Sequence, residues 1–186
     1  MNFLQQQRAR LFYLFVLILG LAWIWISAST SNMVSTRSIP APQKDFLAPA
    51  ISLKSITGEE YQLSNFRGKV ILVNFWASWC PPCKAEMPAI ESIYRRYSDK
   101  GLVVLAVDST IQDKASDVAN FIKTNNLSFP VLMDLTGLAT KTYRIQSLPS
   151  TYFIDKQGII RQIELGGPMS EAYLESTINQ LLEDKP

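Results

Sequence analysis

The chain has 186 residues but no histidine, and its two cysteines, Cys80 and Cys83, are separated by two prolines. A structural zinc site needs four Cys or His ligands, so this chain cannot build one. A haem held by histidine is excluded because no imidazole is present. A disulfide that closes so short a loop would stabilise the fold very little. The pattern therefore predicts no metal and no cofactor beyond a redox-active Cys80–Cys83 disulfide.

Charge is also sparse. Charged residues make up 18% of the chain and the net charge is +2, with no strong cluster of basic residues. This balance gives no argument for nucleic acid as a partner. Hydrophobic residues reach 47%, which is typical of one globular domain with an added apolar segment.

The added apolar segment lies at the N-terminus. Arg8 and Arg10 precede an apolar run over residues 11–26 that is interrupted only by Gly20. Continued to residue 28 as a helix, it would measure about 27 Å, close to the hydrocarbon core of about 30 Å. We therefore predict a transmembrane helix, with the positive residues in the cytoplasm and the following chain outside it.

A cleaved signal peptide is the alternative for this segment, since the small residues Ser27 and Ser29 suit a cleavage site. We favour a retained anchor because the run exceeds the usual signal-peptide core of about 7–15 residues. No cysteine stands directly after the run, which excludes a lipid-modified N-terminus. Residues 1–28 are then the cytoplasmic N-terminus and anchor, residues 29–44 a flexible Ser/Thr/Pro/Ala-rich linker, and residues 45–186 the globular domain.

The globular domain alternates short strands with amphipathic helices. Residues 70–76 and 102–107 are near-continuous apolar runs, typical of strands buried on both faces, and a helix between them favours parallel pairing. A hairpin is predicted over residues 51–63, and the run Asp-Lys-Gln-Gly at residues 155–158 predicts the turn of another. We expect an α/β fold with a mixed central sheet flanked by helices.

The cysteine pair falls between a buried strand and a predicted helix. Pro81 and Pro82 suit the first helical positions, because amides there have no intrahelical partner. Cys80 would then lie at the helix N-terminus, where free amides and the helix dipole stabilise the nucleophilic thiolate. Cys83, one turn further, is the expected resolving thiol. This arrangement predicts a thiol–disulfide oxidoreductase.

Two segments, VILVNFWASWCPPCKAEMP and SLPSTYFID, resemble the thioredoxin-fold oxidoreductases of the TlpA/ResA type, which are tethered outside bacterial membranes. The resemblance covers roughly residues 45–183. It implies a thioredoxin-like domain outside the cytoplasm, held at a bacterial cell membrane by a single span. It also implies a cis peptide bond before Pro149, which would lie against the disulfide, and substrate pairing with the backbone of Leu148.

Residues next to the cysteines are further candidates for substrate contact. Trp79, Pro81 and Pro82 are expected to line the surface around Cys80, whereas Trp76 fits the core about as well as the surface.

Glu86 and Asn74 bear on proton transfer. Glu86 follows Cys83 by three residues and matches a glutamate of the ResA-like proteins; with a raised pKa it could take the proton of Cys83 and return it. The alternative is a solvent-facing helix glutamate. Asn74 occupies the position of a buried aspartate in thioredoxin, and an amide exchanges no protons near neutral pH. Cys80, Cys83 and Glu86 are therefore the candidate catalytic residues.

The resemblance implies a reductase of protein disulfides, such as one that keeps apocytochrome c thiols reduced during cytochrome c maturation. Its electrons would come from a membrane protein of the CcdA or DsbD class. A net disulfide oxidase or a general disulfide reductase of the cell envelope stays open, because the pair Pro81-Pro82 does not define the reduction potential.

Two other functions fit less well. Peroxiredoxins use the pattern P-x-x-x-[TS]-x-x-C, and counting back from either cysteine does not reproduce it. Copper delivery by an Sco-like domain needs C-x-x-x-C and a distant histidine, which this chain lacks, although two thiolates could hold Cu(I) adventitiously.

Overall fold

The structure, a computed structural model, describes residues 13–24, 39–109, 111 and 113–184. The chain divides into two units, Met1–Thr36 and Arg37–Pro186. In the first unit, residues 13–24 are helical. The remaining positions of the predicted anchor, and linker residues 29–38, lie outside the described residues. Within the described ranges, no helix combines the length and hydrophobicity that a membrane span requires.

The second unit alternates short strands with helices, as the sequence predicts. In chain order its described elements are β1 (Ser52–Ser55), β2 (Glu60–Gln62), the 3-10 helix η2 (Leu63–Phe66), β3 (Val70–Trp76), α2 (Pro81–Tyr97), the 3-10 helix η3 (Ser98–Lys100), β4 (Leu102–Asp108), α3 (Ala115–Asn125), β5 (Val131–Met133), α4 (Leu138–Thr142), β6 (Ser150–Ile154), β7 (Ile160–Leu165) and α5 (Glu171–Glu183).

The seven strands form one mixed sheet in the order β2-β1-β5-β4-β3-β6-β7. Strands β3 and β4 pair in parallel over their full length, which confirms the prediction from their two apolar runs. Strand β5 continues the parallel part beside β4, whereas β6 and β7 add antiparallel strands beyond β3. The predicted N-terminal hairpin is also confirmed: it extends the sheet, because β1 pairs with β5.

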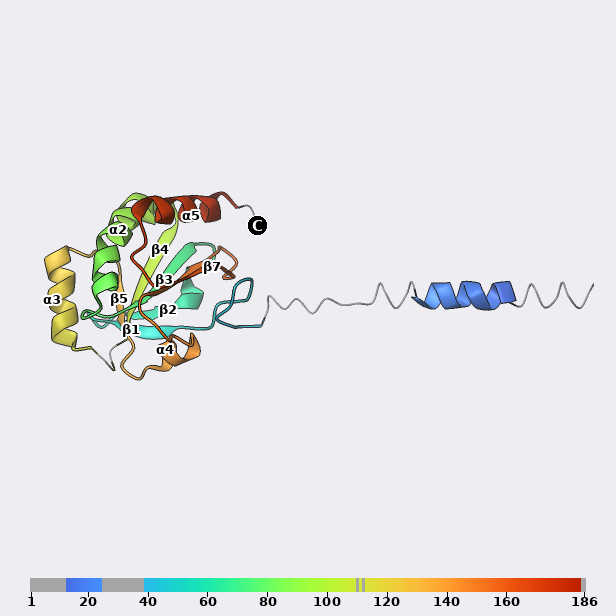
Figure 1. Ribbon diagram of the computed structural model, residues 1–186, viewed down its shortest axis with the longest axis horizontal. Coiled ribbons are helices and arrows are strands. Elements are labelled where there is room, and N and C mark those ends of the chain that lie inside the picture. The colour runs from blue at the N-terminus through green and yellow to red at the C-terminus, as the bar shows by residue number, and fades with distance from the viewer. Residues whose placement is uncertain (1–12, 25–38, 110, 112, 185–186) are drawn as a thin grey trace, which may run out of the picture. The chain divides into compact units, whose positions relative to one another are not determined.

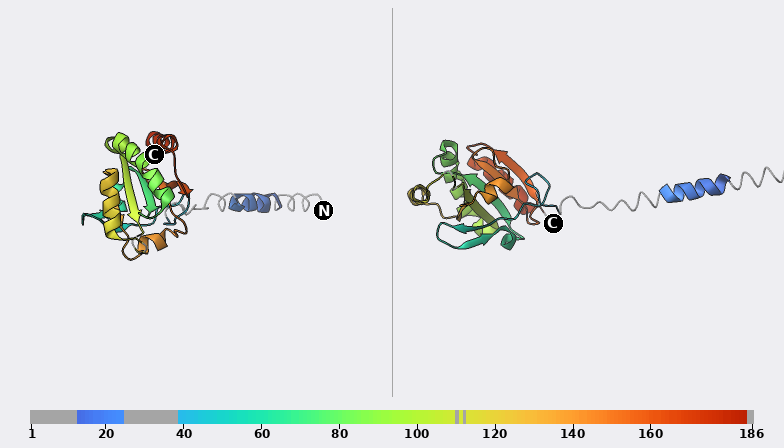
Figure 2. Two further views of the ribbon diagram at one scale, coloured as in Figure 1. Left: turned by 60° about the vertical axis from the view of Figure 1, so that its left-hand side comes forward. Right: turned by 90° about the horizontal axis from the view of Figure 1, so that it is seen from below.

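Helices cover both faces of the sheet, with α2 and α5 side by side on one of them (Figures 1 and 2). Alternate residues of β3 serve two separate cores. Leu72 and Trp76 join the apolar residues of α2, α3 and α5. Val73 and Phe75 pack on the opposite face with Tyr143, which follows α4. Because both faces are covered, every residue of β3 is buried.

The second unit is already structured before residue 45, where the linker was predicted to end. The backbone N–H of Ala41 donates to the carbonyl of Leu47 at 2.9 Å, and that of Asp45 donates to Ile160 at 2.7 Å. Residues 39–44 therefore form turns that connect to the domain.

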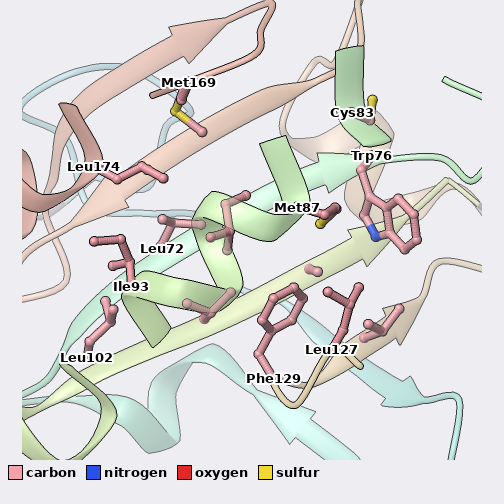
Figure 3. Close-up of a cluster of buried hydrophobic side chains, with 14 of the residues drawn as sticks. Leu72, Trp76, Cys83, Met87, Ile93, Leu102, Leu127, Phe129, Met169 and Leu174 are labelled. Atoms are coloured by element: carbon pink, nitrogen blue, oxygen red, sulfur yellow. The ribbon is translucent and has the colours of Figure 1, made fainter. Parts of the chain in front are cut away.

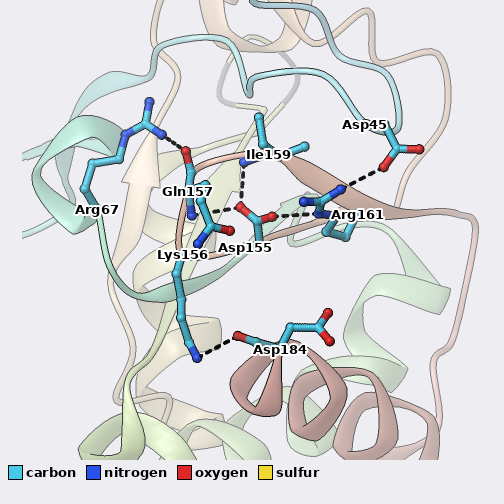
Figure 4. A network of polar contacts seen from close by, with 8 residues as sticks. All are labelled: Asp45, Arg67, Asp155, Lys156, Gln157, Ile159, Arg161 and Asp184. Atoms are coloured by element: carbon cyan, nitrogen blue, oxygen red, sulfur yellow. Dashed lines mark hydrogen bonds and ion pairs between the residues drawn. The ribbon is translucent and has the colours of Figure 1, made fainter. Parts of the chain in front are cut away.

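A polar network around Asp155 holds the turn between β6 and β7 (Figure 4). The buried Asp155 carboxylate accepts hydrogen bonds from the backbone N–H groups of Gln157 and Ile159, both at 2.9 Å, and from Nε of Arg161 at 2.6 Å. The same guanidinium donates to Asp45 at 3.0 Å. The predicted turn at residues 155–158 is confirmed, and this network ties it to the start of the domain.

We expect Asp155→Ala to lower the free energy of unfolding by about 3 kcal/mol, because one buried amide, one part-buried amide and one guanidinium lose their acceptor. Urea denaturation measures the change. Asp184→Ala is the matched control, since only the backbone oxygen of that exposed residue takes part in the network, and we expect an effect within about 0.5 kcal/mol. A loss below about 1 kcal/mol in Asp155→Ala would contradict the assigned role.

Candidate redox site

Cys80 lies where β3 gives way to α2. It is the N-cap residue of α2, and Pro81 and Pro82 occupy the first two helical positions as predicted. The sulfur of Cys80 accepts a hydrogen bond from the backbone N–H of Cys83 at 3.3 Å. A free amide of the first helical turn therefore points at the sulfur, which is the arrangement that stabilises a thiolate.

The two cysteines form a disulfide, with their Cα atoms 5.3 Å apart. Cys83 is fully buried and belongs to the same apolar cluster as Trp76 and Met87 (Figure 3). Cys80 is 3% exposed, and of the two it is the one that lines an open hollow. The geometry therefore gives an incoming sulfur access to Cys80, with Cys83 enclosed behind it.

The hollow beside Cys80, called here the Cys80 hollow, measures about 340 Å³. Four of the predicted substrate-contacting residues line it: Trp79, Pro81, Pro82 and Leu148. Trp79 is 50% exposed, so it lies on the surface as expected, whereas Trp76 is fully buried and packs against Phe121.

The far wall of the Cys80 hollow includes the loop before β6. The peptide bond between Leu148 and Pro149 is cis, as the resemblance implies. The carbonyl of Pro149 accepts a hydrogen bond from the backbone N–H of Gly166 at 2.8 Å, which ties the loop to the end of β7. Among the described residues, no backbone hydrogen bond occupies the amide or carbonyl of Leu148. An extended chain could pair with these groups.

Glu86 is fully buried, so the alternative of a solvent-facing glutamate is wrong. Its Oε1 accepts a hydrogen bond from Nδ2 of Asn74 at 2.8 Å, and its Oε2 accepts one from the backbone N–H of Met169 at 3.3 Å. Nδ2 of Asn74 also donates to Oγ1 of Thr151 at 2.9 Å. Burial raises the pKa of Glu86 to about 7, although the hydrogen bonds from Met169 and Asn74 work in the opposite direction.

Gly167 closes the space around the Glu86 carboxyl. A Cβ at this position would lie 2.6 Å from Oε2 of Glu86 and 2.8 Å from Cγ of Pro149. Glycine is therefore required for the chain after β7 to pass between these two groups. The following bond, Gly167–Pro168, is a second cis peptide. We did not predict this wall of the site, although the run Gly-Gly-Pro at residues 166–168 was a possible signal.

Asp113 is a further residue near the site that sequence reasoning missed. Its carboxylate accepts hydrogen bonds from the backbone N–H of Ser78 and from Oγ of Ser78, the latter at 2.6 Å. Burial alone would raise the pKa of Asp113, but the hydrogen bonds from Ser78 hold it below its usual value. Since Ser78 directly precedes Trp79, this contact fixes the loop that leads into Cys80. No motif surrounds Asp113 that could have indicated it.

A buried strand, a helix capped by Cys80 and a disulfide beside a cis-proline loop define a thioredoxin-fold thiol–disulfide oxidoreductase. The chain belongs to the AhpC/TSA family, whose model matches residues 46–163.

Known relatives agree with this class. The chain is 43% identical over 120 residues to the thioredoxin-like protein YneN of Bacillus subtilis, covering 64% of this chain and 69% of YneN. It is 34% identical over 181 residues to the thiol-disulfide oxidoreductase ResA of Oceanobacillus iheyensis, covering 95% and 92%. The crystal structure of StoA from Bacillus subtilis superposes with a TM-score of 0.61 at 31% identity, covering 69% of this chain and 96% of StoA. The protein is a thiol–disulfide oxidoreductase of the ResA/StoA type.

The buried carboxyl of Glu86 makes the stability of the oxidised protein depend on pH. Its pKa rises from 4.5 to about 7 on folding, so the folded state keeps a proton that the unfolded chain releases. The resulting stability is complete below about pH 4.5 and is lost as the pH rises through 7. At about 1.4 kcal/mol per pH unit, the loss is on the order of 3 kcal/mol.

Glu86→Gln should remove this slope from urea-denaturation curves recorded between pH 4.5 and 7.5. Glu183→Gln, at an exposed position of α5, serves as the control and should keep the slope of the unchanged protein. The same pH dependence in the Glu86→Gln variant would refute the raised pKa.

Proposed function

We propose that the protein is a membrane-anchored reductase of protein disulfides outside the cytoplasm, acting through Cys80 and Cys83. One observation carries the proposal: the Cys80 sulfur accepts a helix N-terminal hydrogen bond and borders an open hollow, while Cys83 is enclosed behind it. This difference in access supports Cys80 as the nucleophile and Cys83 as the resolving thiol.

The reaction starts from the reduced dithiol. The Cys80 thiolate attacks one sulfur of a substrate disulfide, a Cys80–substrate bond forms, and the other substrate sulfur leaves as a thiolate. Cys83 then loses its proton and attacks the Cys80 sulfur. The Cys80–Cys83 disulfide forms and the second substrate thiolate departs, so that two electrons have passed to the substrate.

The proposed role of Glu86 is to accept the proton of Cys83 and to return it. Glu86 lies on the same helix three residues further, a spacing that places two side chains on one helix face. A pKa of about 7 lets its carboxylate accept a proton and its acid form return one near neutral pH. Asn74 donates a hydrogen bond to this carboxyl and orients it without exchanging protons itself.

Trp79, Pro81, Pro82, Leu148 and Pro149 are assigned to substrate contact. The free amide and carbonyl of Leu148 suit strand-like pairing with an extended substrate, which binds many sequences weakly. Trp79 supplies exposed apolar surface next to the nucleophile.

For the location, we propose an anchor over residues 1–28, a linker from residue 29 to the turns at residues 39–44, and the catalytic domain, predicted over residues 45–186, from those turns onward. Arg8 and Arg10 before the apolar run support an anchor in a bacterial cell membrane with the catalytic domain outside the cytoplasm. The similarity to ResA over nearly the whole chain agrees with it. The proposed electron donor is a CcdA- or DsbD-like membrane protein, and apocytochrome c is a candidate substrate. Confinement to the membrane would raise the effective concentration near such a donor.

Exchange with a disulfide-bearing protein substrate tests the assignment of the two thiols. Cys83→Ser should accumulate a mixed disulfide through Cys80 that non-reducing electrophoresis detects, because the resolving step is lost. Cys80→Ser should form none. In the reduced protein, Cys80 should be alkylated at neutral pH faster than a cysteine in a short peptide. Equal rates would remove the basis of the proposal.

The reduction potential of the Cys80–Cys83 couple, measured against glutathione, tests the direction of electron flow. We expect a value well below about −150 mV for a reductase. A value near or above it would identify a net oxidase.

Glu86→Gln should slow thiol exchange near neutral pH by about tenfold or more, because Cys83 loses its proton acceptor. The pH–rate profile of the reduced protein measures the effect, and its inflection near pH 7 should disappear. Glu183→Gln is again the control. A profile that matches the unchanged protein would make the carboxyl a bystander.

A further inference from the structure

A second hollow continues the Cys80 hollow on the side away from α2. It measures about 420 Å³ and shares four lining residues with the first: Ser109, Thr140, Ile145 and Gln146. Beyond them it is lined by Ile111, Gly137, Lys141 and Arg144. The two hollows together form one groove, called here the α4 groove, that starts at Cys80 and passes α4 and the loop that follows it.

The far end of the α4 groove is positively charged. Lys141 and Arg144 are both exposed, and among the described residues neither takes part in an ion pair. The backbone N–H of Arg144 donates to the carbonyl of Lys141 at 3.1 Å, which holds the two positions together. No aspartate or glutamate is among the residues that line either hollow.

Two nearby acids, Asp134 and Asp113, contact elements of the groove, and both are engaged elsewhere. The buried Asp134 carboxylate accepts hydrogen bonds from the backbone N–H groups of Ala139 and Thr140 at the start of α4. Asp113 accepts those of Ser78. The two cations therefore face solvent, and no carboxylate in the part of the chain that the structure describes forms an ion pair with them.

Exposed apolar side chains lie near both ends of the groove. Trp79 at the Cys80 end is 50% exposed, and Ile111 near the cationic end is 66% exposed. Ile111 lies against Gly137, where a Cβ would fall 2.3 Å from its Cδ1. A groove with apolar flanks, free backbone groups at Leu148 and cations at one end suits an extended polypeptide with an acidic side chain.

We infer that the α4 groove binds the substrate segment on one side of the reactive cysteine and selects segments that carry an acidic residue there. The inference rests on the proposed function, because it names the substrate class of that same site. Lys141 and Arg144 are binding residues in this scheme and take no part in the sulfur chemistry.

The test uses cysteine peptides that carry 2-nitro-5-thiobenzoate on the sulfur, so that exchange releases a coloured thiolate. Three peptides differ only in charge: one with two glutamates before the cysteine, one with two glutamates after it, and one with glutamines at all four positions. At low salt, the reduced full-length protein should react with one of the acidic peptides about fivefold faster than with the glutamine peptide. In 1 M NaCl the preference should fall to nearly one.

Charge reversal assigns the effect to the groove. Lys141→Glu/Arg144→Glu should lose the preference, so that the acidic and glutamine peptides react with it at nearly equal rates. A urea-denaturation midpoint that matches the unchanged protein shows that the variant is folded. Lys54→Glu/Lys123→Glu reverses two exposed lysines that line neither hollow, and it should keep the preference.

Two results would overturn the inference while leaving the proposed function intact: equal rates for all three peptides, or a preference that survives the reversal of Lys141 and Arg144. A protein that exchanges with none of the peptides would instead remove the proposed function, and the inference with it.

Discussion

The chemistry of this protein depends on one contact, the hydrogen bond from the backbone N–H of Cys83 to the sulfur of Cys80. The contact exists because the amides in the first turn of a helix have no intrahelical partner. The prolines at the first two helical positions leave the Cys83 amide as the donor nearest the sulfur. The junction of β3 and α2 also separates the two thiols, since one turn of helix carries Cys83 into the core while Cys80 stays at its edge.

Two glutamates on α2 show how the surroundings of a buried carboxyl decide its pKa. Glu86 and Glu91 are both buried. Glu91 accepts two hydrogen bonds from Ser128 and pairs with Arg95, and these outweigh burial so that its pKa is lowered. Glu86 has two neutral donors, Asn74 and Met169, so burial prevails and its pKa rises. The guanidinium of Arg95 stabilises the ionised carboxylate of Glu91. The neutral donors beside Glu86 leave its pKa close to neutral pH, where a carboxyl can exchange protons.

The parts of this structure that depend on local pattern were predictable. The apolar runs at residues 70–76 and 102–107 predicted two parallel buried strands, and the prolines predicted the start of the helix. The cis bond before Pro149 came only from the family resemblance, because composition does not distinguish it from a trans bond. A raised pKa for Glu86 was a hypothesis whose cause, full burial among neutral donors, became clear only in three dimensions.

The remaining parts of the site are contacts between distant segments. Met169 reaches Glu86 across 83 residues of sequence, and Asp113 reaches Ser78 across 35. Periodicity predicts which face of a helix is buried, but not which residue of another segment will lie against it. Gly167 is a further example. A glycine is needed there because the side chains of Glu86, from α2, and Pro149, from the loop before β6, leave no space for a Cβ.

The sulfurs of Cys80 and Cys83 lie in different surroundings. Cys80 lies at the α4 groove, where we propose that exposed residues select the substrate, whereas Cys83 lies in the core on the same helix as Glu86. A buried acid with a pKa near 7 is present in comparable amounts as acid and carboxylate at neutral pH, so moving its proton costs little free energy in either direction. Ionisation of this buried acid also lowers the stability of the folded protein. The packing of the core has to offset that loss. Lys141 and Arg144 belong neither to the cluster around Cys83 nor to the hydrogen-bond partners of Glu86. In the proposed scheme, their substitution therefore changes substrate preference without altering the surroundings of the proton-exchanging pair.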